Sequence, residues 1–233
     1  MARPRKPKAT PSVSLAYIHP GRVHEGFTAS LLAVAERTPF ASKHAASSPR
    51  PTTSRNLVIE DFLNTSHTWL FMVDTDMTFP EDTVERLLAT ATKRGSGGPI
   101  AVSAVNYAYD ANTAELAPVL MFYNDTADRY VGSRLYPDDG KPFRIDATGP
   151  ACMLIHRQIL EDIRGLDETG PSYWFYDQAK DDWFTGNDIV FCDRLRRAGH
   201  QIWVDPTLTT GHIKEIAFDR TLYLAQRAAH FGF

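Results

Sequence analysis

Two carboxylates, Asp74 and Asp76, directly follow the apolar run at residues 69–73, with only Thr75 between them. In open α/β sheets, ligands bind outside the carboxyl ends of the strands. Both carboxylates can turn toward one cation there, because a hard divalent ion takes oxygen ligands and keeps positions for phosphate oxygens. The spacing therefore predicts a divalent-metal site, with an Asp-capped turn as the alternative.

Two groups in the second half of the chain suit the same kind of site. Asp188 comes near the start of an expected helix at 188–198, where a carboxylate either caps the helix or meets an incoming hydroxyl as a base or orienting group. His212 follows Gly211 near a strand end, and a neutral imidazole can complete a metal site begun by carboxylates. None of the other histidines is selected as a metal ligand.

The elements that position these groups alternate between strand and helix in the first half. Helical periodicity and continuous apolar runs distinguish the two kinds of element. This order is typical of an α/β sheet with right-handed crossovers. Strands are expected at 13–18, 69–73 and 100–105. Three helices are expected: one at 24–37, one that begins with Ser54 as its N-cap, and one that begins at Pro80.

The second half has a different pattern, with shorter strands joined by loops. We expect strands at 118–123, 129–135, 151–156 and 201–204, the last ending at Asp205-Pro206, and a closing helix at 219–230. Gly199 follows helix 188–198 at the position where glycine commonly ends helices. Two stretches, 38–53 and 167–182, are long for loops and are expected to form walls around an acceptor.

Composition limits the class of protein. The chain has 233 residues, of which 43% are hydrophobic and 23% charged, so one globular domain is expected and disorder is not the main state. No apolar run approaches the roughly 20 residues that span a bilayer, and no secretory signal is expected. Cys152 and Cys192 are far apart, which argues against a disulfide scaffold or a cysteine zinc site and favours a cytoplasmic protein.

The charge is unevenly distributed. The net charge is −3, but four of the 25 cations lie within residues 1–8, so the rest of the chain carries 21 cations against 28 anions, a net charge of −7. Residues 1–12 are expected to be a disordered basic arm before a catalytic domain at 13–233. An acidic body argues against a broad DNA-binding face, although the arm leaves DNA contacts open.

The joint pattern resembles nucleotide-sugar glycosyltransferases of the GT-A fold, close to the family 2-like branch and including short transferases encoded by bacteriophages. The resemblance extends over about 13–215. The residues that carry it are Phe71-Met72-Val73-Asp74-Thr75-Asp76, Gly186-Asn187-Asp188-Ile189-Val190-Phe191-Cys192-Asp193-Arg194, Gly199, Ile202, Asp205-Pro206, Gly211-His212 and Arg55-Asn56.

This resemblance implies a single α/β domain with a GT-A, Rossmann-like, mixed and mainly parallel sheet flanked by helices. Residues 13–105 would form the nucleotide-sugar-binding half, 106–215 the acceptor side, and 216–233 a C-terminal helix. For a phage-encoded protein the compartment would be the host cytoplasm.

The resemblance also implies roles for individual residues. Asp188 would be catalytic, because the family often has Glu-Asp where this chain has Asn187-Asp188, and Asn cannot be a base. Mn²⁺ or Mg²⁺ would be held by Asp74, Asp76 and His212. The acceptor would contact Trp183, Asp182 and Asn187. The nucleotide sugar would contact His19, Pro20, Arg55, Asn56, Asp74, Thr75 and Lys214.

The function implied is metal-dependent transfer of a sugar from a nucleotide-sugar donor, with UDP favoured, to an acceptor hydroxyl. The acceptor could be a modified phage DNA base, a protein or a glycan. Two alternatives stay open. One is a metal-dependent phosphoesterase or nuclease that uses Asp74, Asp76, Asp188 and His212. The other is a non-catalytic sugar- or nucleic-acid-binding module.

Overall fold

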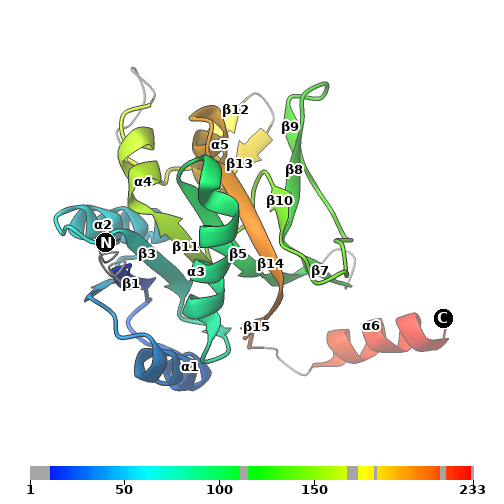
Figure 1. Ribbon diagram of the computed structural model, residues 1–233. Helices are drawn as coiled ribbons and strands as arrows, with labels where there is room; N and C mark the ends of the chain where they lie inside the picture. The colour runs from blue at the N-terminus through cyan, green and yellow to red at the C-terminus, as the bar shows by residue number, and fades with distance from the viewer. Residues whose placement is uncertain (1–10, 111–114, 167–172, 181–182, 216–218, 232–233) are drawn as a thin grey trace, which may run out of the picture.

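A seven-stranded sheet forms the centre of the protein in a computed structural model that describes residues 11–110, 115–166, 173–180, 183–215 and 219–231 (Figure 1). Its strand order is β10-β14-β5-β11-β3-β1-β2. The strands are β1 (Val13–Ile18), β2 (Ser42–Ala46), β3 (Trp69–Asp74), β5 (Ile100–Val105), β10 (Phe143–Ile145), β11 (Cys152–His156) and β14 (Gln201–Thr209).

Most of this sheet is parallel. β2, β1 and β3 are parallel to one another, β14 is parallel to β5, and β11 runs antiparallel between β3 and β5. β10 pairs antiparallel with β14 at the edge. The carboxyl ends of β1, β3, β5 and β14 therefore meet at one edge of the sheet, where ligand sites form in such folds.

Helices cover both faces of the sheet, and two hydrophobic clusters fill the layers between them. Alternate residues of β3 enter the two clusters, Met72 on one face and Phe71 on the other, which explains its continuous apolar sequence. α2 (Pro51–Leu63), α4 (Arg157–Ile163) and α5 (Asn187–Arg197) contribute to the first cluster, and α1 (Glu25–Arg37) and α3 (Thr83–Arg94) contribute to the second.

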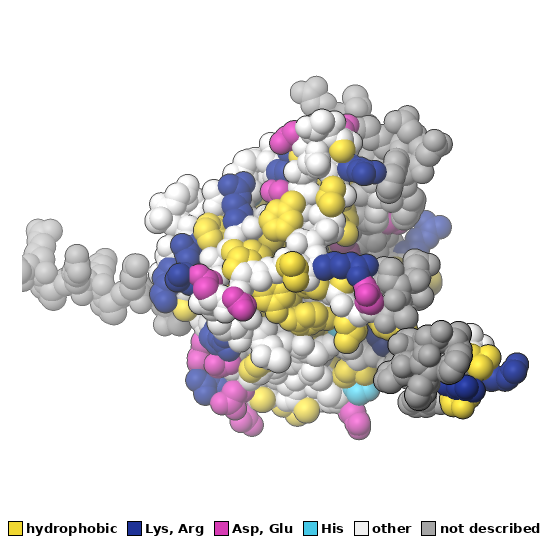
Figure 2. Space-filling view, turned by 90° about the vertical axis from the view of Figure 1, so that its right-hand side faces the viewer, with side chains coloured by type: hydrophobic (Ala, Val, Ile, Leu, Met, Phe, Trp, Pro, Cys, Tyr) yellow, Lys and Arg dark blue, Asp and Glu magenta, His cyan; other side chains and the backbone are white. Residues whose placement is uncertain are grey.

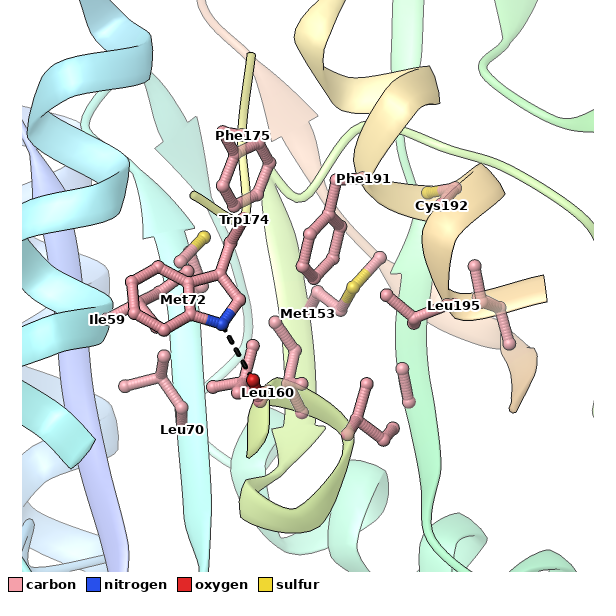
Figure 3. Close-up of a cluster of buried hydrophobic side chains, with 14 of the residues drawn as sticks. Ile59, Leu70, Met72, Met153, Leu160, Trp174, Phe175, Phe191, Cys192 and Leu195 are labelled. Carbon is pink, nitrogen blue, oxygen red and sulfur yellow. Dashed lines mark hydrogen bonds between the residues drawn. The ribbon is translucent and has the colours of Figure 1, made fainter. Parts of the chain in front are cut away.

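The first cluster contains the largest fully buried side chain, that of Trp174. Trp174 lies among residues from α2, β3 and α4, and Phe175 faces Phe191 of α5 (Figure 3). Cys152 and Cys192 are buried free thiols on opposite faces of the sheet. No helix in the described part of the chain has the length and apolar character that crossing a membrane requires.

The remaining elements are short pairs at the sheet margins. β4 (Met77–Thr78) pairs with β15 (Gly211–His212), and α6 (Arg220–Phe231) projects from the body (Figure 1). Three further hairpins are β6 (Tyr107–Asp110) with β7 (Glu115–Pro118), β8 (Met121–Asn124) with β9 (Arg129–Gly132), and β12 (Gln178–Lys180) with β13 (Trp183–Thr185). A short 3-10 turn, Gly95–Gly97, follows α3.

The hairpins β6–β7 and β8–β9 expose apolar pairs. Tyr109 lies opposite Leu116 and Phe122 opposite Val131, and all four side chains are exposed. Figure 2 looks onto this side of the molecule and shows hydrophobic side chains gathered on it. Directly opposed side chains contact each other in a hairpin, so these pairs stabilise two-stranded elements that would be marginal alone.

Three local expectations were wrong in detail. The stretch 38–53 is not one loop, because Ser42–Ala46 forms the edge strand β2, whose sequence has little apolar signal. Ser54 is buried inside α2, which begins at Pro51, where the missing N–H costs nothing in a first turn. β14 continues past Asp205-Pro206 to Thr209, because a register irregularity there accommodates the proline.

The ends of the chain differ from the expected boundaries by small amounts. Ser12 already belongs to the ordered body, since its carbonyl accepts hydrogen bonds from the backbone of Thr68 and Trp69. Residues 1–10 of the expected arm, and the stretch 167–172, lie outside the described residues. The closing helix was expected at 219–230 and is observed at Arg220–Phe231.

Candidate functional site

The site is assembled where the loop after β3 meets β15. Gly211 pairs with Thr78 and His212 with Met77. The Ile213 N–H also donates to the Asp76 carbonyl, at 2.8 Å. This short antiparallel ladder brings a segment more than 130 residues distant against the Asp74-Thr75-Asp76 turn, and it places His212 beside Asp76.

One carboxylate oxygen of Asp76 lies beside two basic side chains. Its Oδ2 lies 2.6 Å from Nζ of Lys214 and 3.1 Å from Nε2 of His212. Burial alone would raise the pKa of Asp76, but the Lys214 hydrogen bond and the His212 charge outweigh it and lower the pKa. The carboxylate is therefore ionised at neutral pH and ready to bind a cation.

The second ring nitrogen of His212 decides which form of the ring the site favours. Nδ1 lies 2.8 Å from the carbonyl oxygen of Tyr107, which can only accept, so Nδ1 carries the proton. In the neutral ring, Nε2 then presents its lone pair toward Asp76. A lone pair facing a carboxylate calls for a proton or a metal cation between them, and a carbonyl that fixes the tautomer is typical of histidine metal ligands.

The described residues contain no preformed group of three or more His, Cys, Asp or Glu side chains that could hold a metal. Asp76 and His212 are in contact, whereas Asp74 is turned toward Arg55. Two protein ligands fit Mn²⁺ or Mg²⁺ in a phosphate-transfer setting, because such ions take one or two carboxylates and complete their coordination with substrate phosphates and water. The expected third ligand, Asp74, is engaged elsewhere.

Arg55 is the centre of a polar network that joins Asp74 to the start of α5. Its side chain is 8% exposed and its guanidinium reaches Asp74 through Nη2, at 3.3 Å. Nη1 donates to Asn187 Oδ1 at 2.7 Å and to Asp188 Oδ1. Phe175 packs against the guanidinium, with the ring centroid 5.3 Å away. One side chain of α2 therefore joins carboxylates that are 114 residues apart in the sequence.

Asp188 lies in the first turn of α5, whose N-cap residue is Gly186. Burial raises the pKa of Asp188, and the nearby charge of Arg55 only partly opposes this. Arg55 holds Oδ1, while Oδ2 lies beside Gly149, where a Cβ atom would be 3.7 Å away. The side chain of Asp188 is 37% exposed, so a hydroxyl group can reach the carboxylate.

Asn56, which was expected to contact the nucleotide sugar, makes its side-chain hydrogen bonds with the protein backbone. Its Oδ1 accepts from the backbone N–H groups of Trp174 and Phe175, at 3.1 and 2.9 Å, and its Nδ2 donates to the Phe175 carbonyl, at 2.8 Å. All three contacts go to protein backbone, so Asn56 anchors a chain segment. Its neighbour Arg55 points into the site.

A cavity of about 950 Å³ opens beside the Asp74-Thr75-Asp76 turn. It brings together His19, Pro20, Arg55 and Thr75 of the expected nucleotide-sugar group. Thr75 itself is tied back by a hydroxyl hydrogen bond to the Ile18 carbonyl, at 3.2 Å. Residues that the sequence did not single out also line it, including Arg22, His24, Glu25 and Glu215.

The acceptor-side predictions are only partly placed. Trp183 belongs to β13 and pairs with Lys180, and Asp182 lies outside the described residues. Ser47–Pro49, within the stretch expected to form an acceptor wall, line the cavity near Asp74. Asp177 was missed by sequence reasoning. It accepts two hydrogen bonds from Asn187, and a lone Asp outside a motif carries no signal of such a contact.

Neither a protein-family model nor a curated protein sequence matches the chain. Solved structures do resemble it. A197 from STIV, a viral protein, is 13% identical with a TM-score of 0.54, and the match covers 88% of this chain and 86% of that one. GalNAc-T7, solved with UDP, GalNAc and Mn²⁺, is 13% identical with a TM-score of 0.59 over 90% of this chain.

The chain spans 45% of the GalNAc-T7 chain. Identities this low show the fold alone. The protein is thus a mixed α/β domain with a GT-A-like fold, which confirms the fold class expected from the sequence.

The close approach of β15 to β4 makes a prediction about Gly211. A Cβ atom there would lie 2.5 Å from Oγ1 of Thr78, so Gly211→Ala requires Thr78 or β15 to shift, and a shift of β15 moves His212 away from Asp76. We expect at least a tenfold loss of Mn²⁺ affinity, in the range found when groups that orient metal ligands are removed, measured by isothermal titration calorimetry.

Two variants control this experiment. Gly97→Ala should leave Mn²⁺ affinity unchanged, since a Cβ atom there meets nothing within 4 Å. Thr78→Ala combined with Gly211→Ala should recover affinity, because it removes the clashing hydroxyl. Unchanged Mn²⁺ binding by Gly211→Ala alone would contradict a role for β15 in placing His212.

Proposed function

We propose that the protein is a metal-dependent glycosyltransferase that moves a sugar from a nucleotide sugar, with a UDP-sugar favoured, to an acceptor hydroxyl. The observation that supports this most is the pairing of Asp76 with His212 beside the cavity at the carboxyl edge of the sheet. The GT-A-like fold and the nearby Asp188 agree with the same chemistry.

The cavity suits a nucleotide sugar in size. Its volume of about 950 Å³ lies within the usual range for small-molecule sites. His19 and Pro20, after β1, would lie near the base, and Asp76 with His212 would hold the metal against the diphosphate. Lys214 would exchange its contact with Asp76 for the diphosphate, because the bound cation takes its place on that carboxylate.

In the proposed reaction, the bond between the sugar C1 and the diphosphate oxygen breaks, and a bond forms between C1 and the acceptor oxygen. The acceptor proton goes to Asp188 Oδ2, while Arg55 holds Oδ1. A divalent ion, when bound, supplies Lewis-acid stabilisation of the leaving diphosphate. Lys214 adds a positive charge where negative charge develops.

Metal-dependent donor binding tests this proposal. With Mn²⁺ present and a UDP-sugar at about 100 times its Kd, we expect Tm to rise by about 5–10 °C, from the free energy of binding and the size of the domain. Asp76→Ala should abolish the shift, because it removes the carboxylate that joins His212 and Lys214. Differential scanning fluorimetry with UDP-glucose, UDP-N-acetylglucosamine and a GDP-sugar measures it.

The exposed residue Asp125, on the β8–β9 turn, offers a matched control, and Asp125→Ala should keep the full shift. A shift of the same size without Mn²⁺, or in Asp76→Ala, would contradict the metal assignment. Phosphodiester hydrolysis without sugar transfer would favour the phosphoesterase alternative. For the acceptor, a screen with mass detection should offer hydroxymethylated DNA, peptides and simple sugars.

A further inference from the structure

The segment before β12 is rigidly attached to the core. The indole Nε1 of Trp174 donates to the Leu160 carbonyl at 2.7 Å, and the side chain is 2% exposed. Phe175 stacks on Phe191 of α5, with centroids 4.3 Å apart and planes 10° from parallel (Figure 3). Together with the three hydrogen bonds between this segment and Asn56 of α2, these contacts leave little freedom to the residues that follow.

Asp177 comes two residues after Phe175 and reaches the first residue of α5. Its Oδ1 accepts from the backbone N–H of Asn187 at 3.0 Å and from Nδ2 of the same residue at 3.1 Å. The first contact satisfies a free N–H at the start of a helix. The second determines which way the Asn187 amide points, because a carboxylate accepts only from its NH₂ group.

The amide orientation matters because Arg55 lies on the other side of Asn187. With Nδ2 held by Asp177, Oδ1 necessarily faces Nη1 of Arg55, at 2.7 Å. A flipped amide would place two donors against each other. The Nε of Arg55 is buried and has no hydrogen-bond partner among the described residues, so the two Nη groups hold the guanidinium. The two Nη groups donate to Asp74, Asp188 and Asn187, and of these three acceptors only Asn187 is neutral.

The same guanidinium joins the two carboxylates of the site. Nη1 donates to Asp188, and Nη2 donates to Asp74. Because the guanidinium is planar and rigid, a rotation at one end changes the geometry at the other. The position of Asp188 relative to Asp74 therefore depends on Asn187, and through Asn187 on Asp177.

We infer that Asp177 is a positioning residue: through Asn187 and Arg55 it sets the place of the Asp188 carboxylate relative to Asp74. This inference rests on the proposed function for its kinetic consequence. Asp177 touches neither the donor nor the reacting atoms in this scheme. It should therefore act on the rate of the chemical step, while donor binding at Asp76 and His212 stays the same.

The first test compares Asp177→Ala with Asp177→Asn. The alanine variant should lower kcat about 10- to 100-fold, the usual cost of removing a group that orients a reactive side chain, with KM for the UDP-sugar unchanged. The asparagine variant keeps an oxygen acceptor for the Asn187 groups and should retain most of the rate. UDP release from the UDP-sugar that gives the largest thermal shift is the readout, with Asp125→Ala as the control.

The second test exchanges the two side chains. Asn187→Asp sets two carboxylates against each other and should lower both kcat and Tm. Adding Asp177→Asn restores one donor and one acceptor across this contact, so the double variant should recover at least tenfold in kcat over Asn187→Asp and regain Tm. If each substitution only destabilised the loop, the two losses would add and the double variant would not recover. Recovery therefore shows that the two side chains interact with each other.

The outcomes separate the inference from the function on which it rests. Equal kcat in Asp177→Ala and wild type, or additive effects of the two exchange substitutions on kcat and Tm, would overturn the inference. If the wild-type protein binds no UDP-sugar but the exchange restores Tm, the proposed function fails and the positioning of Asp188 by Asp177 is supported. Restored Tm together with restored kcat supports both.

Discussion

Asp188→Asn is expected to bind a UDP-sugar with Mn²⁺ as tightly as wild type and to lose sugar transfer by about 10²- to 10⁴-fold, the usual contribution of a general base. The substitution keeps the shape of the side chain and an oxygen for Arg55, but an amide cannot take the acceptor proton. Donor binding is measured by the thermal shift and transfer by mass detection of the product. Unchanged transfer would remove Asp188 from the mechanism.

The pH profile of the wild-type enzyme gives an independent measure of the same group. Burial raises the pKa of Asp188, with Arg55 opposing the shift. The transfer rate should therefore fall, as the pH decreases, at a pH above the ordinary carboxyl pKa of 3.8. The base is active only when deprotonated, so the loss lies on the acidic side. Because its pKa is raised, Asp188 binds its proton more tightly in the folded state than in the unfolded state. The stability that this proton contributes is lost as the pH rises through the raised pKa.

The residual activity of Asp188→Asn should lack this acidic limb. An acidic limb at the same pH in both proteins would show that a group other than Asp188 causes it. Asp193→Asn, also on α5 and paired with Arg196, is the matched control and should keep the wild-type profile.

Arg55→Met is expected to lower both stability and transfer, because it leaves Asp74 and Asp188 without their shared cation. Removing one partner of a fully buried ion pair costs about 3–5 kcal/mol. The side chains of Asp74 and Asp188 are 25% and 37% exposed, so water offsets part of this cost. We expect a loss of about 2 kcal/mol and a Tm lower by about 4–8 °C.

Arg37 offers a close control for this effect. It also bridges two carboxylates, Glu81 and Glu85, but on the surface, where its side chain is 43% exposed. Such pairs contribute about 0–1 kcal/mol, so Arg37→Met should lower Tm by at most about 2–4 °C. Equal losses in the two variants would contradict the role given to Arg55.

Arg55→Lys separates charge from geometry. A lysine supplies the positive charge but cannot donate to Asp74, Asn187 and Asp188 at once from a planar fork. Most of the stability should return while transfer stays low. Full recovery of transfer would show that Arg55 acts only as a counter-charge, and it would contradict the geometric coupling of the two carboxylates.

Local sequence determined the central elements and the position of the first two carboxylates. The unbroken apolar run predicted β3. Each face of this strand packs against a separate cluster, so its residues must be apolar on both faces. α3 followed from its apolar periodicity, and the placement of Asp74 at the end of a buried strand followed from β3 itself. These features depend on neighbours within a few residues, so the chain records them directly.

Only the tertiary structure decided which side chains meet. β2 is a polar edge strand held by backbone pairing to β1, and Asn56 could not be distinguished from a ligand-binding residue by its position next to Arg55. Asp177 has its role because the anchored Trp174-Phe175 segment lies against α5. The physical reason is that hydrogen-bond partners at the sheet edge come from loops far apart in sequence, whereas burial patterns that specify strands and helices are local.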